Sequence, residues 1–309
     1  MTLAFVDRIS TALNIQRKDM IEKDIILHQI LTDLSDNRFF SKNFLFKGGT
    51  CLIKHYLGYF RFSEDIDFTW RNQSRFKGKT GNQIRKDLSG IINETGKVFE
   101  DIATKRGLDF KCVKSNKDYV ELGGSNKICT FKIWYDSEIL KKESFIKVQI
   151  NFVEDICLKS RNGKLSSLLS GKHEELAALF AEYSEYSTSV PFDMYDASEI
   201  LSEKIRALLT RKGIKARDFV DILFIYKKLG IKPSDVEKHV TKKTNHTIKL
   251  YSKYRTNLRE KEKLLEQNRI FEWGAERELL LSKLDEKEFY EFVNGFTNYL
   301  KTLVKKFKR

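Results

Sequence analysis

A glycine pair between an apolar strand and a helix is the feature that most constrains the fold of this chain. The apolar run at 44–46 is typical of a short buried strand, and Gly48 and Gly49 interrupt it. Residues 50–59 then have the spacing of a helix with one apolar side. Backbone N–H groups at such a turn bind phosphate. The pattern therefore predicts that Gly48, Gly49 and Thr50 hold the phosphates of a ligand.

Two carboxylates follow in a segment where polar and apolar residues alternate. Asp65 and Asp67 flank Ile66, so in a strand both carboxylates lie on one face. Two like charges that close resist joint ionisation unless a cation lies between them, and their oxygen atoms suit Mg²⁺ or Mn²⁺. The alternative is a solvated strand face, which explains most isolated Asp-x-Asp pairs. Next to the glycine turn, Asp65 and Asp67 predict a metal–triphosphate site.

The strand that could complete such a site supplies no further carboxylate on its polar face. The best candidate strand covers residues 145–153, and its polar face carries Lys147, Gln149 and Asn151. Gln149 and Asn151 are further candidate ligands, because amide oxygens also bind hard ions, although more weakly than carboxylates. Asp155 after the strand is another candidate, as is Asp218. This departure favours a one-metal site over a conventional two-metal mechanism.

The order of glycine turn, helix and carboxylate strand resembles the core of polymerase-beta-type nucleotidyltransferases. More narrowly, it resembles the first motif of the AbiEii/AbiGii abortive-infection toxin family, which includes the MenT toxins. The residues that carry this resemblance are Gly48, Gly49, Thr50, Leu52, Lys54, Arg61, Ser63, Asp65 and Asp67. The resemblance implies that Lys54, Arg61 and Ser63 join the glycine turn in binding the nucleotide.

Two later helical segments extend the resemblance, at 198–207 and 217–222. On a helical wheel Lys204 falls within the apolar side of the first segment, where a lysine either meets an internal carboxylate or reaches a phosphate. Asp218 falls in an apolar sector of the second segment, although helix capping is an alternative for it. Asp221 is the weaker candidate, since pairing with Lys228 on a solvated edge would explain it.

The resemblance implies a metal-dependent and NTP-dependent nucleotidyltransferase that transfers NMP to an acceptor hydroxyl. The expected acceptor is RNA, in particular the tRNA 3′ end, and the expected role is a toxin with a cognate antitoxin as protein partner. Asp65, Asp67, Lys204 and Asp218 are the predicted catalytic residues. Two alternatives remain: a degenerate fold that binds nucleotide or RNA without chemistry, and a module that binds an antitoxin.

Composition limits the other classes of function. The 309 residues carry a net charge of +14, and a Lys/Arg surplus of seven lies in residues 232–309. Six basic residues and no acid occupy residues 71–86. Both features favour a polyanionic partner, although a generally lysine-rich surface is the alternative.

The four cysteines form no CxxC pair, and no Walker or Gly-x-Ser-x-Gly sequence occurs. With no apolar segment for a leader or a membrane span, we expect no membrane partner and a cytoplasmic protein.

The predicted fold class is α+β. A mixed sheet with flanking helices is expected to form a polymerase-beta-like nucleotidyltransferase domain over residues 1–165. A C-terminal helical bundle is expected over residues 166–309, and it would contribute Lys204 and Asp218 to the site.

Overall fold

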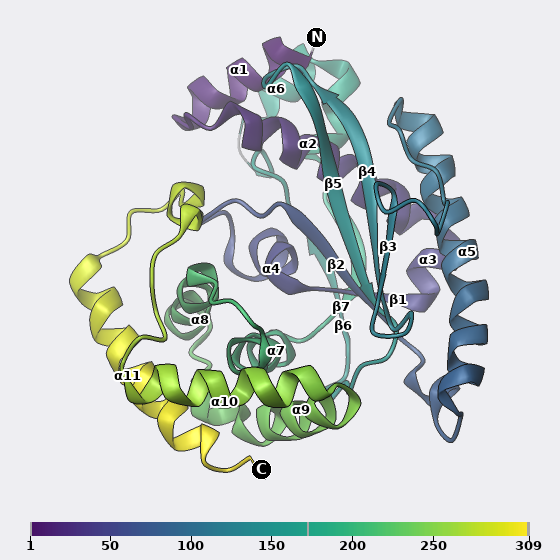
Figure 1. Cartoon of the computed structure of the whole chain (residues 1–309). Helices are drawn as coiled ribbons and strands as arrows, with labels where there is room; N and C mark the ends of the chain where they lie inside the picture. Colours follow the sequence, from purple (N-terminus) through teal and green to yellow (C-terminus); the bar gives the residue numbers. More distant parts are fainter. Residues whose placement is uncertain (1, 172, 308–309) are drawn as a thin grey trace. The chain divides into compact units, whose positions relative to one another are not determined.

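The computed structural model describes residues 2–171 and 173–307, and the chain forms two compact units. Unit 1 comprises Met1–Glu154 and Ser160–Met194. Unit 2 comprises Asp155–Lys159 and Tyr195–Arg309. The chain therefore passes between the units at three points, two of them on either side of a five-residue segment (Figure 1).

The described part of unit 1 contains a mixed sheet of seven strands in the order β3-β4-β5-β2-β1-β7-β6. Strand β2 runs antiparallel to β1 and parallel to β5, and β1 runs parallel to β7. The strands are β1 (Phe44–Lys47), β2 (Asp65–Trp70), β3 (Val120–Gly123), β4 (Ile128–Ser137), β5 (Lys142–Asn151), β6 (Arg161–Leu165) and β7 (Val190–Met194). The expected mixed sheet with flanking helices is confirmed.

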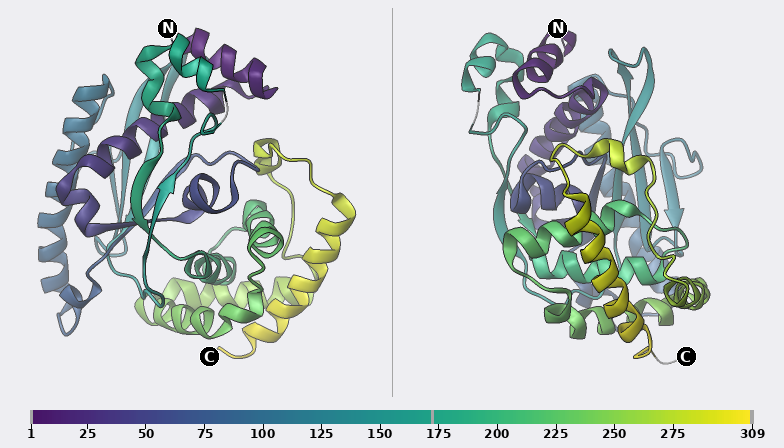
Figure 2. Two further views of the ribbon diagram at one scale, coloured as in Figure 1. Left: turned by 180° about the vertical axis from the view of Figure 1, so that it is seen from behind. Right: turned by 90° about the vertical axis from the view of Figure 1, so that its left-hand side faces the viewer.

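Helices flank this sheet (Figure 2). They are α1 (Thr2–Leu13), α2 (Lys18–Asp36), α3 (Arg38–Asn43), α4 (Gly48–Cys51), α5 (Gly81–Arg106) and α6 (Glu174–Leu179), with shorter turns η1 (Leu52–Leu57), η2 (Gln73–Phe76) and η3 (Ala181–Ser187). The longest, α5, has well-defined ends. Thr80 and Gln83 form a capping box at its start, and Gly107 ends it in the left-handed conformation.

Strand alternation divides the central strands into an apolar and a polar face. On the apolar face Phe44 of β1 packs against Phe40 of α3, with ring centroids 4.3 Å apart. Phe68 of β2 meets the same Phe40 ring at 4.7 Å. On β4, Phe131 packs against Phe99 of α5 at 4.9 Å. These aromatic contacts fix α3 and α5 on the apolar face, so the acidic residues of β2 are directed to the other face.

Two local predictions differ from the structure. The composition of residues 108–113 predicts a strand, but these residues form none, and Asp109 makes only an isolated bridge to Trp134. The helix predicted over residues 50–59 begins two residues earlier, at Gly48, and continues as the π-helical turn η1. It ends before Gly58, whose φ of +72° is a backbone conformation that residues other than glycine rarely adopt.

The structure also divides the chain later than the predicted boundary at residue 165. Residues 190–194 form β7, which pairs in parallel with β1 through Phe46 and Met194. A strand that is separated from its partner by more than a hundred residues cannot be assigned to a sheet from local spacing. The helical unit therefore begins at Tyr195, and it also includes Asp155–Lys159.

Unit 2 is helical, as expected for the C-terminal part of the chain. Its elements are α7 (Ala197–Thr210), α8 (Ala216–Leu229), α9 (Glu237–Leu250), α10 (Ser252–Glu266) and α11 (Glu286–Val304), with short turns η4 (Pro233–Val236) and η5 (Ala275–Leu279). Phe219 of α8 packs against Phe296 of α11 and Phe271 in its core. Among the described residues of either unit, no helix is long and apolar enough to cross a membrane.

Candidate active site

The glycine turn lies directly against the second carboxylate of β2. Gly48 has a φ of +79°, and a Cβ added there would overlap the Oδ2 atom of Asp67. A side chain at this position would therefore meet both backbone strain and a steric clash. The sequence pattern predicted this juxtaposition, and the structure brings Gly48 and Asp67 together.

Three further predicted residues hold the turn to the segment before β2. Thr50 lies with its hydroxyl 2.8 Å from Ser63 Oγ, and it also donates a hydrogen bond to the backbone carbonyl of Asp65. Arg61 is 1% exposed and donates to the carbonyl of Phe62 at 2.7 Å. A Cβ on Gly49 would lie 2.7 Å from Arg61 Nη2, so both glycines are closely approached. Thr50, Arg61 and Ser63 thus define the shape of the turn; their predicted role in binding nucleotide stays a prediction.

The register of the sheet places the two aspartates in a polar row across the strands. Asp65 lies opposite Lys147 of β5, and Asp67 lies opposite Gln149. Lys147 Nζ is 3.8 Å from Asp65 Oδ2. The next pair along, Thr69 and Asn151, is also in register. Because residues opposite each other on neighbouring strands share a face, Gln149 and Asn151 lie on the same face as the carboxylates.

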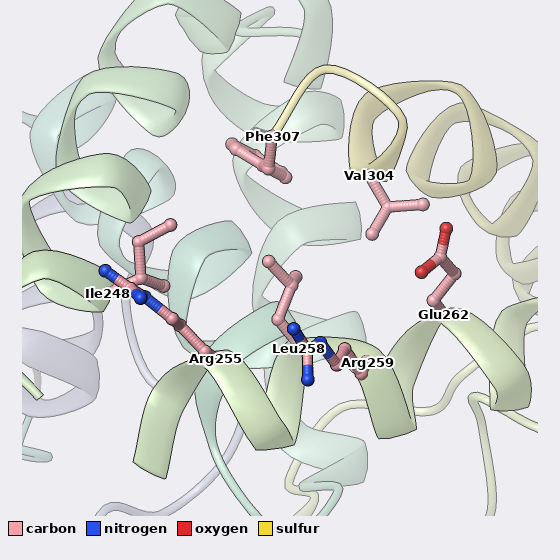
Figure 3. Close-up of a pocket in the computed structure, with 7 residues that line it drawn as sticks. All are labelled: Ile248, Arg255, Leu258, Arg259, Glu262, Val304 and Phe307. Atoms are coloured by element: carbon pink, nitrogen blue, oxygen red, sulfur yellow. The ribbon is translucent and has the colours of Figure 1, made fainter. Parts of the chain in front are cut away.

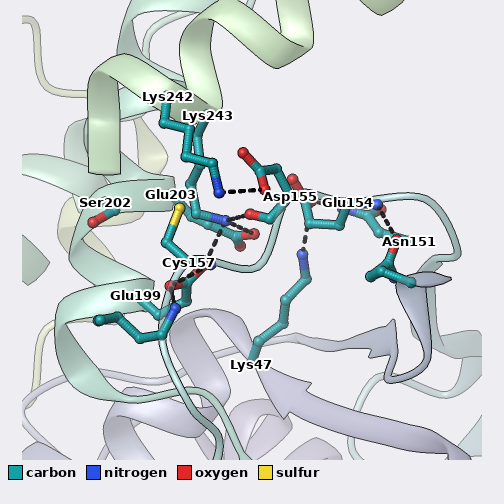
Figure 4. Close-up of polar contacts among 12 residues, drawn as sticks. Lys47, Asn151, Glu154, Asp155, Cys157, Glu199, Ser202, Glu203, Lys242 and Lys243 are labelled. Atoms are coloured by element: carbon teal, nitrogen blue, oxygen red, sulfur yellow. Dashed lines mark hydrogen bonds and ion pairs between the residues drawn. The ribbon is translucent and has the colours of Figure 1, made fainter. Parts of the chain in front are cut away.

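A buried ion pair closes one side of this polar face. Lys47, the last residue of β1, lies opposite Asp67 and is 4% exposed. Its Nζ is 3.4 Å from Glu154 Oε2, and the same oxygen accepts a hydrogen bond of 3.1 Å from Asn151 (Figure 4). The backbone N–H of Glu154 donates to Gln73 Oε1 at 2.9 Å. The chain after β5 is thereby held so that Glu154 returns to the polar face.

Lys54 belongs to a different cluster in the interior of unit 1. Its ammonium is 1% exposed and lies 2.9 Å from Asp24 Oδ1 of α2. Tyr59 and Tyr186 both donate to Asp24 Oδ2, at 2.9 and 2.7 Å. Burial lowers the pKa of Lys54, and the charge of Asp24 acts in the opposite direction. These contacts give Lys54 a role in holding α2 to η1, and its predicted contact with nucleotide stays untested.

In unit 2, Lys204 joins α7 to α8. Its Nζ lies 3.0 Å from Asp218 Oδ1 and 2.5 Å from Asp221 Oδ2. Of the two alternatives that the helical wheel left open, this is the internal carboxylate pairing. Arg211 adds a second cation, with Nη1 2.9 Å from Asp218 Oδ2. Burial alone would raise the pKa of Asp218, but Lys204 and Arg211 outweigh it and hold this pKa well below its usual range.

The structure corrects the interpretation of Asp221. Its side chain is fully buried and not on a solvated edge, and it shares Lys204 with Asp218. The wheel misplaced it because the Cα direction alone does not show how α7 packs on α8. Asp221 is therefore as close to Lys204 as Asp218 is.

Two cavities in the described part of unit 2 contain none of these residues. One cavity of about 30 Å³ holds about one water molecule, and its lining residues are Ile248, Arg255, Leu258, Arg259, Glu262, Val304 and Phe307 (Figure 3). Another, of about 410 Å³, is lined by Tyr226, Lys232, Pro233, Ser234, Phe292, Gly295, Phe296 and Tyr299. Neither is lined by paired carboxylates, so neither is a candidate for metal-assisted chemistry.

Comparison with known proteins identifies the family. The family model described as "Nucleotidyl transferase AbiEii toxin, Type IV TA system" matches residues 29–298, which is most of the chain. The chain belongs to the AbiEii family. Family membership makes it a nucleotidyltransferase toxin of a toxin–antitoxin system, and it confirms the resemblance noted in the sequence.

Solved structures and curated proteins add little to the AbiEii match. JHP933 from Helicobacter pylori is 14% identical, with a TM-score of 0.43 over 93% of this chain and 94% of that one. A putative nucleotidyltransferase from H. pylori is also 14% identical, with a TM-score of 0.42 over 94% of this chain and 98% of that one. Among curated proteins none matches the chain.

The residues present at the candidate site fit a single hard metal ion. Asp65 and Asp67 offer carboxylate oxygens, and the side-chain oxygens of Thr69 and Asn151 are buried without a hydrogen-bond partner in the structure. Oxygen atoms are the ligands that Mg²⁺ takes. Among residues 2–171 and 173–307, no three or more His, Cys, Asp or Glu side chains are grouped as in a preformed metal site. The donor set therefore fits an ion that takes its remaining ligands from water and phosphate.

Two residues of this face were not predicted as site residues, Lys47 and Glu154. Lys47 directly follows the apolar Phe46, so strand alternation alone would have placed it on the opposite, polar face. Glu154 had no such signal. It lies beyond the strand, and only the fold of the chain after β5 brings it back to Lys47.

Proposed function

We propose that the protein transfers NMP from an NTP, bound with Mg²⁺ or Mn²⁺, to a hydroxyl of RNA. The 3′ end of tRNA is the favoured acceptor, and the proposed biological role is that of a toxin restrained by a cognate antitoxin. The observation that carries this proposal is the contact of the Gly48 turn with Asp67 on the polar face of β2. This contact places the proposed phosphate-binding turn next to a proposed metal-binding carboxylate.

In this proposal the N–H groups at the Gly48–Thr50 turn bind the triphosphate, while Asp65 and Asp67 hold the metal ion. When bound there, a divalent ion neutralises charge that develops on the phosphates. The acceptor hydroxyl oxygen forms a bond to the α-phosphorus, and the bond from that phosphorus to pyrophosphate breaks. The hydroxyl proton passes to solvent. The contribution of the protein is positioning and electrostatic stabilisation.

Arg61 supports the proposal by its position. It is buried against Gly49, and a guanidinium beside the turn suits a triphosphate. Lys204 and Asp218 remain proposed participants, as residues of unit 2 that form a buried charged cluster. Their contribution to transfer is separable from their contribution to stability only by measuring both.

The test is label transfer. Wild-type protein is incubated with Mg²⁺, total RNA and each labelled NTP in turn, and the RNA 3′ ends are sequenced. We expect added nucleotides with wild type and none with Asp65→Ala. Absence of transfer with every NTP, alongside a known transferase that labels the same RNA, would reject the proposal.

A binding-only function is the second candidate, and one observation favours it. Lys147 Nζ lies 3.8 Å from Asp65 Oδ2, and β5 places no carboxylate opposite Asp65, Asp67 or Thr69. If the protein acts by binding alone, Asp65→Ala/Asp67→Ala should remain toxic when expressed without antitoxin. Loss of toxicity in a folded double variant would exclude this candidate.

A further inference from the structure

The number of metal ions that the site can hold follows from the charges around its carboxylates. Asp67 lies opposite Lys47 on one side, and Asp65 lies 3.8 Å from Lys147 on the other. Opposed residues of antiparallel strands have Cβ atoms about 5 Å apart. Each aspartate therefore shares its face of the sheet with a neighbouring lysine, Lys147 in contact with Asp65 and Lys47 in register with Asp67.

Lys47 is held in place by more than its own strand. Its ammonium meets Glu154 at 3.4 Å, and Asn151 donates to the same carboxylate oxygen (Figure 4). The side chains of Lys47 and Glu154 are 5% and 8% exposed. A buried pair of this kind has a large desolvation cost and persists only where its surroundings hold it. Its position beside Asp67 gives it a role that stability alone does not explain.

We propose that the site binds a single divalent ion and that Lys47, fixed by Glu154, supplies the positive charge that a second ion would otherwise bring. A two-metal site uses its ions to stabilise both the attacking and the leaving oxygen. Here one ion neutralises Asp65 and Asp67, after which a second would meet the ammonium groups of Lys47 and Lys147. Like charges at such distances in a partly buried site repel strongly. Lys47 is thus a positioning residue for the bound phosphates.

This inference rests on the proposed function only for the metal site, so its test measures metal binding and not transfer. Mn²⁺ is titrated into the full-length protein, and free Mn²⁺ is followed by electron paramagnetic resonance. We expect one Mn²⁺ per chain for wild type. Lys47→Met should expose Glu154 as a third carboxylate beside Asp67, so a second Mn²⁺ should bind.

Replacing Glu154, the partner of Lys47, should change Mn²⁺ binding in the opposite direction. Glu154→Gln removes the carboxylate charge that faces the ammonium of Lys47, and we expect the affinity for the single Mn²⁺ to fall roughly tenfold. The double variant Lys47→Met/Glu154→Gln removes both charges, so it should again bind one Mn²⁺ with nearly wild-type affinity. A merely structural pair would lower thermal stability in all three variants without this pattern in Mn²⁺ binding. Lys42→Met, at an exposed lysine of α3, is the matched control.

The results of the Mn²⁺ titrations distinguish the single-ion inference from the proposed function. Two Mn²⁺ ions per wild-type chain would overturn this inference and leave the proposed function intact. The same conclusion would follow if Lys47→Met and Glu154→Gln left Mn²⁺ binding unchanged while Asp67→Asn abolished it. No Mn²⁺ binding by wild type, or binding unaffected by Asp67→Asn, would reject the metal assignment itself and with it both proposals.

Discussion

At the scale of single residues, glycines and lysines in this chain have separate roles that their neighbours decide. Gly48 lies against a carboxylate, whereas Gly78, with a φ of +72°, has nothing within 4 Å of the place that a Cβ would occupy. Lys54 is paired in the interior with Asp24. Lys47 is paired with Glu154 and lies opposite Asp67 on the neighbouring strand. The residue type alone does not distinguish these cases, because each depends on a contact made by a distant segment.

Gly48→Ala is expected to abolish nucleotidyl transfer. The added methyl group would overlap Asp67 and strain the left-handed backbone, which costs about 1–2 kcal/mol by itself. Gly78→Ala carries the same backbone strain without the contact, so it should lose a similar amount of stability and keep its activity. Label transfer and urea denaturation of both variants check this, and equal activity of the two would contradict it.

Lys54→Met is expected to destabilise unit 1 by roughly 3–5 kcal/mol, because it leaves the buried carboxylate of Asp24 without its cation. If the role of Lys54 is structural, Lys54→Met/Asp24→Asn should recover much of this loss, and its activity per folded molecule should stay near wild type. Denaturation curves and transfer assays test the pair. A stable Lys54→Met variant without activity would instead favour the predicted contact with nucleotide.

At the scale of elements, the same charged residues that were predicted to be catalytic also join helices. Lys204 of α7 contacts two acids of α8, and Lys243 of α9 lies 2.6 Å from Glu199 of α7 (Figure 4). Glu199 also accepts hydrogen bonds from the backbone of Cys157 and Leu158. This second cluster fixes the segment Asp155–Lys159 within unit 2. Helix wheels predicted that Lys204 is inward, but its partners depend on the packing of whole helices.

The α7–α8 junction is expected to weaken in acid. The pKa of Asp218 is depressed in the folded protein, so its contribution to stability is present above the unfolded pKa of about 4 and is lost as the pH falls toward the folded value. Asp218→Asn should lower the free energy of unfolding by roughly 2–4 kcal/mol at neutral pH and flatten its dependence below pH 4.

Urea denaturation between pH 7 and pH 2 measures this effect. Glu291→Gln, at an exposed acid of α11, is the control and should leave the acid dependence as steep as in wild type. A wild-type slope in Asp218→Asn would show that Asp218 does not bind its proton differently in the folded state.

At the scale of the whole molecule, charge is the property that sequence describes best. The net charge of +14 is spread over both parts of the chain, with six basic residues at 71–86 and a surplus of seven at 232–309. Within residues 71–86, Arg71 is paired with Asp193 and Lys79 with Asp87, whereas Lys77 and, at the start of α5, Arg85 and Lys86 are exposed. These three side chains are available to a polyanion.

RNA binding is therefore expected to weaken as salt increases. Each phosphate contact contributes about 0.9 to the slope of log affinity against log salt for duplex nucleic acid and about 0.7 for single strands. Replacing Lys77, Arg85 and Lys86 with Gln should reduce the slope by roughly two to three. Fluorescence anisotropy with labelled tRNA over a KCl series checks this, and Lys111→Gln/Lys117→Gln is a control at exposed lysines elsewhere in unit 1. An unchanged slope in the triple variant would place the RNA surface elsewhere.

The sequence by itself determined the motif core and the fold class. A turn between strand and helix and an alternating strand depend on neighbouring residues, so the turn at Gly48 and the shared strand face of Asp65 and Asp67 could be predicted before any contact was known. Only the tertiary structure decided that β7 completes the sheet, that Glu154 returns to Lys47, and that Asp221 is buried with Lys204. These depend on segments far apart in the chain, and their positions follow from the packing of whole elements, which local spacing does not encode.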